Sequence, residues 1–463
     1  MLLSVVRTQK EQRYLVGVSH RWQTDQLETT YGEYTNVNSL AEDNLENNNM
    51  VAVTLTASEA EELKEKPEIA FVEEDIEVKA CGKTNSVNYM KRAHEKKESR
   101  IKENKSQSQW NMRMINRDKI KKEKKLGKKK IKVAVLDSGV DYWDDIDLAE
   151  SLTLVPNEEE MSLLFMDATG HGNSVAGLIA AKDNGTGITG VNPDAEIYSI
   201  RVLDNNNCSP VSRIVEGIYI AIDRKVDIIN MSFGVSTYSA ALEQAVKDAE
   251  KAGILMIAAA GNEGEKGVQY PAAFDEVVAV GSVDKEGNIA NDSSVGEQVE
   301  LVAPGELVMS TGDFGDVKVA SGTSLAAPQV AGTASLIWQK DPNLPAGFIR
   351  KVLKESANSY GEHNQYGSGL LDVEYALKCY DIMKEQYEKT NDIDTMNMPE
   401  NNEKIVTFDE TGCVEGNWAA SEHQKMVDSK YTLVKKGARF PDENNCFEKM
   451  TYRPWWHGYW KTM

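Results

Sequence analysis

Short hydrophobic runs and longer amphipathic segments alternate through the middle of the chain. Between residues 131 and 376, runs rich in Val, Ile and Ala are separated by stretches whose apolar residues recur at helical spacing, such as Ile214, Ile218 and Ile222. A continuous apolar run is typical of a strand buried on both faces, and strands that alternate with helices indicate parallel βαβ units. We therefore predict an α/β domain with a covered, mostly parallel central sheet. Its predicted strands are residues 131–136, 197–202, 226–231, 254–259, 277–280 and 299–302.

The pattern ahead of this domain predicts a small α+β unit over residues 14–80. Its strands are expected at residues 14–18, 51–55 and 69–72. A helix is expected between the last two strands, because Ser58 and Glu61 have the spacing of a capping box and Pro67 marks a helix end.

Polar segments divide the chain further. A length of 463 residues exceeds the size at which one hydrophobic core usually keeps growing. Residues 91–132 are rich in Lys and Arg, which favours a solvated linker. A stretch rich in Asn, Asp and Glu follows Met383. We predict an N-terminal domain at 1–81, a basic linker at 82–109, the α/β domain at 110–383, a polar linker at 384–403 and a small C-terminal module at 404–463.

The C-terminal module holds four of the eight tryptophans, and these allow two interpretations. They are Trp418, Trp455, Trp456 and Trp460. Aromatic clusters form small cores and ligand-binding surfaces alike, so both roles stay open. Cys413 and Cys446 could form one disulfide here, but none of the five cysteines has the close spacing of a zinc or redox site, and unpaired thiols are favoured.

Charge and hydropathy narrow the classes of function. Acidic residues outnumber basic ones by 73 to 52, giving a net charge of −21, which disfavours binding to nucleic acid or anionic membranes. No run approaches the roughly 18 to 20 apolar residues of a transmembrane helix. The opening residues are also shorter than the apolar segment of a secretory signal, so we predict no transmembrane segment and no signal peptide.

Four polar residues stand at the ends of predicted strands or at the starts of helices. Asp137 ends a buried strand, where open α/β sheets place their sites, and His171 opens a helix of small residues. Asn262 follows a strand among glycines, and Ser324 begins a helix whose free amides face an attacking oxygen. Each fragment alone is more often structural. Together, in the order Asp, His, Asn, Ser and each at a strand or helix end, they are very unlikely to coincide by chance, so they indicate one functional site.

The set of fragments resembles the subtilase family of subtilisin-like serine proteases. The resemblance covers most of residues 110–376 and implies a three-layer subtilisin-like fold with a mostly parallel central sheet. The matching stretches are residues 133–141, 170–181, 229–234, 258–264, 270–272 and 322–332.

The resemblance implies a serine endopeptidase that acts on polypeptides and needs no cofactor for its chemistry. Ser324 would attack the scissile carbonyl, His171 would accept and return its proton, and Asp137 would orient the imidazole. Asn262 would donate a hydrogen bond to the oxyanion beside the Ser324 amide. The implied substrate-binding residues are Ser232, Phe233 and Gly234 along the substrate backbone, and Gly261 and Gln269 at the primary specificity pocket.

Two positions depart from the family pattern. The motif that usually reads Gly-Thr-His after the catalytic histidine continues here with Asn173 and Ser174, which changes neighbours of the triad without removing a catalytic group. Gln269 stands where the family often has a small residue, so a deep pocket for aromatic side chains is not expected.

Residues 14–81 resemble the inhibitory propeptide of the same family, on the stretches 14–18, 51–55 and 71–75. The resemblance implies that residues 78–81 enter the cleft with Cys81 in the primary pocket, and that the chain cleaves itself near Cys81. The basic linker offers other cleavage points before residues 106–110, where the resemblance to the mature enzyme resumes.

Three further expectations follow from the resemblance. Structural calcium would be held near Asp147 and Asn184, with Gln107 as a weaker candidate. A full-length propeptide resembles the exported branch of the family, so an extracellular or cell-surface location is preferred although no signal peptide is predicted. The alternative function is a catalytically silent relative that binds peptides or mediates adhesion, with the tryptophan-rich module as its binding surface.

Overall fold

The computed structural model describes most of the chain between residues 11 and 396 and four short strands beyond it. The described residues are 11–19, 34–36, 49–82, 109–120, 129–141, 145–156, 167, 169–185, 187–312, 317–394, 396, 406–408, 433–435, 450–452 and 460–462. No helix within these residues is long and apolar enough to cross a bilayer.

Seven parallel strands form the central sheet, in the order β14-β13-β12-β10-β6-β8-β7. They are β6 (Lys132–Asp137), β7 (Leu148–Thr153), β8 (Glu196–Arg201), β10 (Ile228–Met231), β12 (Leu255–Ala259), β13 (Val277–Val283) and β14 (Val299–Pro304). All the predicted strands are present within a few residues. The edge strand β7 is not predicted by the pattern, because its sequence LAESLT is only half-buried and carries Glu150 towards Arg224.

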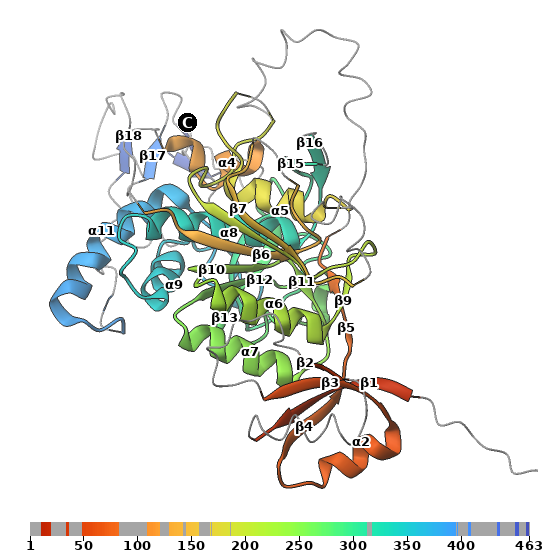
Figure 1. Cartoon of the computed structure of the whole chain (residues 1–463). Helices are drawn as coiled ribbons and strands as arrows, with labels where there is room; N and C mark the ends of the chain where they lie inside the picture. Colours follow the sequence, from red (N-terminus) through yellow and green to blue (C-terminus); the bar gives the residue numbers. More distant parts are fainter. Residues whose placement is uncertain are drawn as a thin grey trace, which may run out of the picture.

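Helices cover both faces of the sheet, so the domain has three layers (Figure 1). Side chains alternate along β6: Val133 and Val135 join the core beneath one helical layer, whereas Ala134 and Leu136 join the core beneath the other. The first layer contains α5 (His171–Ala180), α8 (Thr323–Trp338), α9 (Ala346–Glu355) and α11 (Val373–Thr390). The second contains α6 (Val211–Asp223) and α7 (Ala240–Lys251).

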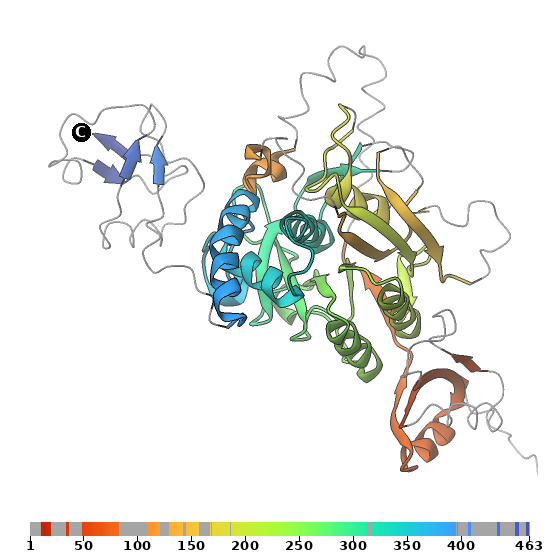
Figure 2. The ribbon, with the colours of Figure 1, turned by 60° about the vertical axis from the view of Figure 1, so that its left-hand side comes forward.

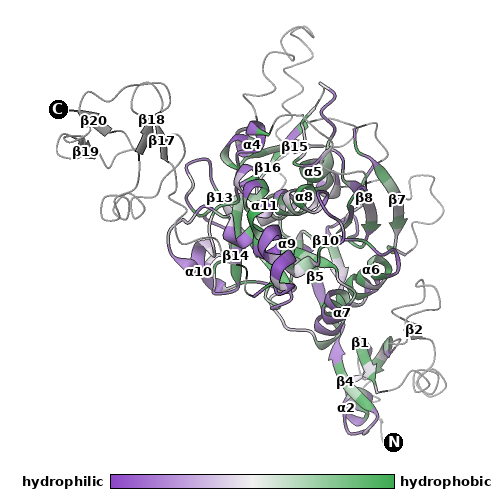
Figure 3. Ribbon diagram, turned by 90° about the vertical axis from the view of Figure 1, so that its left-hand side faces the viewer, coloured by the Kyte–Doolittle hydropathy of each residue, from purple (hydrophilic) through white to green (hydrophobic). Residues whose placement is uncertain are grey.

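The depth of a helix in these layers follows its sequence. Every residue of α8 is buried, because the helix passes through the core and carries small and apolar side chains all round. By contrast, α9 lies on the outside and has hydrophilic residues on its outer side (Figure 3).

The remaining short helices are α4 (Trp110–Met114), η2 (Arg117–Lys119), η3 (Gly264–Lys266) and α10 (His363–Tyr366). A hairpin is formed by β15 (Val308–Thr311) and β16 (Val317–Ala320).

The N-terminal region is a four-stranded antiparallel sheet with one helix; the helix and three of the strands are predicted by the pattern, and the short strand β2 is not. The strands are β1 (Glu11–Val18), β2 (Tyr34–Asn36), β3 (Met50–Thr56) and β4 (Ile69–Glu74), in the order β2-β3-β1-β4, and the helix is α2 (Ala57–Lys64). This region forms a lobe of its own beside α6 and α7 (Figure 2). Leu15, Met50 and Ala52 of its sheet belong to the apolar cluster that contains those two helices.

The predicted capping box of α2 was wrong by two residues. The cap is Thr56, whose hydroxyl accepts a hydrogen bond from Glu59 N, while the Glu59 carboxylate accepts one from Thr56 N. Ser58 and Glu61 have the same spacing but lie inside the helix. Thr56 is favoured because it ends β3, where the backbone is still extended as a helix cap requires.

Parts of the predicted organisation lie outside the described residues. These include Gln107, Cys413, Cys446, Trp418, Trp455 and Trp456. In the C-terminal module the structure describes β17 (Val406–Phe408), β18 (Leu433–Lys435), β19 (Met450–Tyr452) and β20 (Trp460–Thr462), paired as β17-β18 and β19-β20. The domain limits stay predictions, and α11 runs through the predicted limit at residue 383. The cysteines described, Cys81, Cys208 and Cys379, are free.

Candidate active site

The order of the strands creates a crevice at the carboxyl end of β6. From this strand the chain moves to β8 and β7 on one side, and later to β10, β12, β13 and β14 on the other. Loops that leave neighbouring strands in opposite directions leave a crevice at such a switch point. Asp137 ends β6, Ser232 follows β10 and Asn262 follows β12, so three of the predicted site residues lie along this edge.

Asp137 and His171 form a buried hydrogen-bonded pair. The distance between His171 Nδ1 and Asp137 Oδ1 is 2.7 Å. Burial disfavours a charge on His171, but the charge and hydrogen bond of Asp137, aided by the charge of Asp167, outweigh burial and raise the pKa of His171. The pair therefore holds the ring with Nε2 turned away from the carboxylate, as a general base requires.

Ser324 is the second residue of α8, at the amino end of the central helix. Its carbonyl has no helical partner, because Pro328 stands four residues later and has no N–H. The Ser232 hydroxyl donates to that carbonyl at 3.1 Å and so satisfies it. Pro328 and Ser232 thus fix the turn that carries Ser324.

The N-terminal region sends an extended arm into the crevice. This arm is β5 (Glu77–Ala80), and it pairs antiparallel with β11 (Phe233–Gly234) on one side and β9 (Cys208–Pro210) on the other. Cys81 continues the arm, and its N–H donates to Ser232 O at 3.0 Å. A chain segment added between two strands is the arrangement by which an extended peptide is recognised.

The arm ends with the Cys81 carbonyl at Ser324 and with Gly82 beside Ser324 and His171. Ser324 N donates to Cys81 O at 3.1 Å. A Cβ added to Gly82 would lie 2.6 Å from Ser324 Oγ and 2.9 Å from His171 Nε2, so both atoms meet the chain at the same α-carbon. Neither atom has a hydrogen-bond partner among the residues that the structure describes. The Cys81–Gly82 peptide bond therefore sits where Ser324 and His171 converge.

Asn262 lies on the other side of the Cys81 carbonyl. Its Oδ1 accepts hydrogen bonds from the amide and the hydroxyl of Thr323, each at 3.0 Å. These bonds turn Nδ2 away from Thr323. A Cβ added to Gly322 would lie 2.4 Å from Cys81 O and 3.0 Å from Asn262 Nδ2. Both atoms are therefore next to the α-carbon of Gly322.

The Cys81 side chain is buried against Gln269. The thiol donates to Gln269 Oε1 at 3.5 Å, and Gln269 Nε2 donates to Ser236 Oγ at 3.2 Å. A Cβ added to Gly234 or Gly261 would come within 2.7 Å and 2.6 Å of Gln269 Oε1, so the amide fills the space between these glycines. Burial, with the charges of Asp137 and Glu263, raises the pKa of Cys81 to about 12, and the thiol stays neutral.

A second carboxylate, which the sequence analysis missed, supports the first turn of α5. Asp167 Oδ1 accepts hydrogen bonds from Ser138 Oγ at 2.7 Å and Gly170 N at 2.8 Å, and Oδ2 accepts one from Asn173 N at 2.8 Å. Burial raises the pKa of Asp167, against these hydrogen bonds, which lower it. A carboxylate just ahead of a helix start was the available signal, because acidic groups favour helix amino ends.

Asn173, which belongs to the first departure from the family pattern, joins the same network. Its Nδ2 donates to Asp141 Oδ2 at 2.7 Å, and its Oδ1 accepts from Asp141 N at 2.9 Å. Ser174, the next residue of that motif, contacts Gly170 O and Thr311 O through its hydroxyl. Both side chains are buried and fully used in tying α5 to its surroundings, and neither contacts His171 Nε2.

The two described residues expected to hold calcium make other contacts. The Asp147 carboxylate forms an ion pair with Lys130, and Asn184 Nδ2 donates to Asp145 Oδ1 at 2.5 Å. Among the described residues there is no group of three or more His, Cys, Asp or Glu side chains placed to hold a metal. In this arrangement both side chains are engaged by other protein groups.

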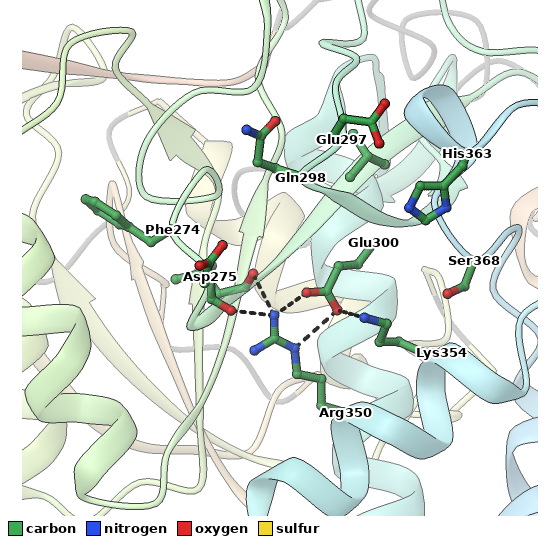
Figure 4. Close-up of a pocket in the computed structure, with 11 residues that line it drawn as sticks. Phe274, Asp275, Glu297, Gln298, Glu300, Arg350, Lys354, His363 and Ser368 are labelled. Atoms are coloured by element: carbon green, nitrogen blue, oxygen red, sulfur yellow. Dashed lines mark hydrogen bonds and ion pairs between the residues drawn. The ribbon is translucent and has the colours of Figure 1, made fainter. Parts of the chain in front are cut away.

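A separate pocket lies away from the crevice, between β14, α9 and α10 (Figure 4). Arg350 reaches across it to the Glu300 carboxylate and to the Asp275 carbonyl, and Lys354 lies 3.5 Å from the same carboxylate. The hydrogen bonds and ion pairs of Arg350 and Lys354 hold α9 against the edge of the sheet. The pocket contains none of the predicted site residues.

Two carboxylates of the N-terminal region also cap helices of the α/β domain. Glu73 accepts hydrogen bonds from Ser239 Oγ, Ala240 N and Ala241 N at the start of α7. Asp75 accepts bonds from the amide and the hydroxyl of Ser212 at the start of α6. The N-terminal region is therefore held both in the crevice and on the α6/α7 face.

Comparisons with known proteins agree with this arrangement. Residues 128–369 match the Subtilase family, and residues 19–80 match the family Peptidase inhibitor I9. Subtilisin DY from Bacillus licheniformis is 42% identical over 253 residues, which is 54% of this chain and 91% of that protein. Subtilisin Savinase from Lederbergia lenta is 40% identical over 248 residues, which is again 54% of this chain and 91% of that protein. Subtilisin NAT from Bacillus subtilis subsp. natto is 36% identical over 335 residues, covering 71% of this chain and 81% of that protein.

The family match spans more than half of the chain, and the inhibitor match covers the lobe that enters the crevice. The chain belongs to the subtilase family and is a subtilisin-like serine endopeptidase made as a zymogen with its own inhibitor propeptide.

Proposed function

We propose that the enzyme hydrolyses peptide bonds with Ser324 as nucleophile, His171 as general base and Asp137 as the group that orients the imidazole. Ser324 Oγ attacks the carbonyl carbon, and its proton passes to His171 Nε2. The C–N bond then breaks, the leaving amine takes that proton, and water releases the acyl group from Ser324. Protein groups supply every step of this chemistry.

The observation that carries this proposal is the seated Cys81–Gly82 bond. The Cys81 carbonyl accepts a hydrogen bond from Ser324 N at 3.1 Å, in the position where a developing oxyanion needs a donor. Asn262 is the second donor in the proposal, because its oxygen is engaged by Thr323 and its Nδ2 is left for the substrate. The first substrate of the enzyme is thus its own chain, and the propeptide ends at Cys81.

We assign substrate binding to two groups of residues. Ser232, Phe233 and Gly234 pair with the backbone of the peptide before the scissile bond, as they do with β5 and Cys81. Gly261 and Gln269 limit the primary pocket. Because the Gln269 amide fills the space between Gly234 and Gly261, we expect cleavage after small residues such as Cys and Ala.

Two finer expectations also remain proposals. Structural calcium at Asp147 and Asn184 requires the cation to displace Lys130 from the Asp147 carboxylate. A calcium-dependent rise in the melting temperature, lost on Asp147→Asn, would support it. The tryptophan-rich module at residues 404–463 is proposed to bind a surface ligand, and its removal should change retention on cells or glycans while peptide hydrolysis is kept.

Mass spectrometry of purified wild type and Ser324→Ala, with a fluorophosphonate label applied to both, tests the central proposal. Wild type should lose a segment ending at Cys81 and take the label, whereas Ser324→Ala should keep the segment and stay unlabelled. Two intact, unlabelled proteins would instead favour a silent relative that binds peptides. Loss of the segment from both proteins would point to another protease.

A further inference from the structure

Backbone recognition of the propeptide arm continues beyond the strand that enters the crevice. Val211 N donates to Ile76 O at 3.0 Å, one residue before β5 begins. Asp75 N donates instead to Arg13 O, within the propeptide itself. Substrate residues are numbered P1, P2 and onward from the scissile bond towards the N-terminus, so Cys81 is P1 and Ile76 is P6. The α/β domain therefore contacts the main chain as far as P6. Asp75, at P7, directly precedes this last backbone contact, and the chain bends there, because Ile76 N donates to Glu74 O at 2.9 Å.

The Asp75 side chain occupies a site built by the amino end of α6. It is fully buried, with Oδ1 accepting from Ser212 N at 2.9 Å and Oδ2 accepting from Ser212 Oγ at 2.7 Å. The residue that precedes the helix, Pro210, provides no side-chain cap. The first turn of α6 therefore depends on a carboxylate from the propeptide, and loss of the propeptide leaves its donors without that partner.

We propose that this end of α6 is a subsite of the mature enzyme that selects an acidic residue at P7 of extended polypeptide substrates. The inference rests on the proposed self-processing, because that assigns Cys81 to P1. A seated carboxylate and an unbroken path of backbone contacts from Ser324 to Val211 both support it. A substrate that follows the same path brings its P7 side chain to Ser212.

The matching contact on α7 does not extend to substrates. Glu73, which caps α7, lies at P9 on β4, beyond the point where the chain turns into the propeptide sheet. An unfolded substrate has no such turn, so its P9 side chain has no defined route to Ser239. The two helix caps therefore differ: Glu73 lies within a strand of the propeptide sheet, whereas Asp75 is the residue next to the last backbone contact with the α/β domain.

Neighbouring charges act on the P7 residue as well. Arg13 also donates to Asp75, at 2.9 Å, but it belongs to the propeptide and is absent from a substrate complex. Arg213 of α6 remains in the mature enzyme and attracts the Asp75 carboxylate, although Asp204 and Glu216 partly offset its charge. The amide and hydroxyl of Ser212 supply the selective contacts, and hydrogen bonds to a carboxylate are stronger than those to a neutral amide.

Internally quenched peptides with the sequence of residues 75–84 test the subsite on the processed wild-type enzyme. We expect kcat/KM to fall about tenfold when the P7 Asp is replaced by Asn, and further with Lys. A matched peptide with Gln in place of the P5 residue Glu77 is the control. That side chain is exposed, so its replacement should change kcat/KM less than about twofold.

An enzyme variant connects the preference to α6. In Ser212→Ala the ratio of kcat/KM between the Asp and Asn peptides should shrink to about threefold, because one of two donors is lost. Equal hydrolysis of the Asp, Asn and Lys peptides by wild type would overturn the subsite and leave the protease intact. If wild type hydrolyses none of the peptides, the proposed self-processing activity fails and the subsite fails with it.

Discussion

The α/β domain holds its propeptide at two regions that use different chemistry. In the crevice the contacts are mainly between backbones, from Val211–Ile76 to Ser324–Cys81, with one small side chain in the pocket. On the α6/α7 face the contacts are carboxylates at helix ends and apolar residues of the propeptide sheet. Cutting the Cys81–Gly82 bond removes none of these contacts. In the proposed self-cleavage, the crevice sets the position of the cut, and the contacts of both regions hold the cleaved segment.

The largest expected effect comes from a substitution that disables catalysis in the crevice and leaves the helix face unchanged. Asp137→Asn should slow loss of the propeptide by about 10⁴-fold, because the imidazole loses the carboxylate that fixes its tautomer. Timed mass spectrometry measures the loss. Asp372→Asn is the control for stability: it also changes a buried carboxylate, which caps α11 and accepts from Asn116 and Asn358 and is not one of the predicted site residues. Equal slowing in both variants would mean that stability, and not catalysis, was lost.

A change of side chain in the pocket should have the next largest effect. Cys81→Phe should slow self-cleavage by about 10- to 100-fold, because the larger ring meets the Gln269 amide. Cys81→Ala should cleave at nearly the wild-type rate, and Gln269→Ala should restore cleavage of the Phe variant. If Cys81→Phe is processed normally without that second change, Gln269 does not limit the pocket.

A single change on the helix face should affect release and leave cleavage intact. Glu73→Gln weakens three hydrogen bonds at the start of α7, so the cleaved propeptide should dissociate about tenfold more readily. Gel filtration of the processed protein measures the fraction still bound. Glu74→Gln is a matched control, because it removes the same charge from the next residue, which is exposed. The same release from both variants would assign the effect to net charge.

The smallest effect should be a shift in pH dependence. His171 must be neutral to accept a proton, and the charge of Asp167 helps to raise its pKa. Asp167→Asn should therefore lower that pKa and move the acid limb of kcat/KM to lower pH. Fluorophosphonate titration corrects for the fraction of folded enzyme. An unchanged acid limb with reduced activity would show that Asp167 acts only through its hydrogen bonds to α5.

Periodic patterns predicted most of the fold because they are local. The buried strands of the sheet, the stripe on α6 and the strands of the propeptide each follow from residues close in sequence. The half-buried edge strand β7 was missed, since its pattern is weak, and the cap of α2 was misplaced because two Ser/Thr-x-x-Glu spacings overlap.

The candidate site was predicted in part for the same reason. Asp137, His171, Asn262 and Ser324 each stand at the end of a strand or the start of a helix, and such positions can be recognised locally. Asp167 was missed because its partner Ser138 lies 29 residues away and neither has a motif of its own.

The sequence by itself determined the family, most of the elements and the residues proposed as the catalytic set. Only the tertiary structure decided that Cys81–Gly82 lies at Ser324, that Gln269 fills the space between Gly234 and Gly261, and that propeptide carboxylates cap α6 and α7. The Asp75–Ser212 contact joins residues 137 apart in sequence. Such contacts depend on how whole elements dock, and no local pattern of polar and apolar residues records that geometry.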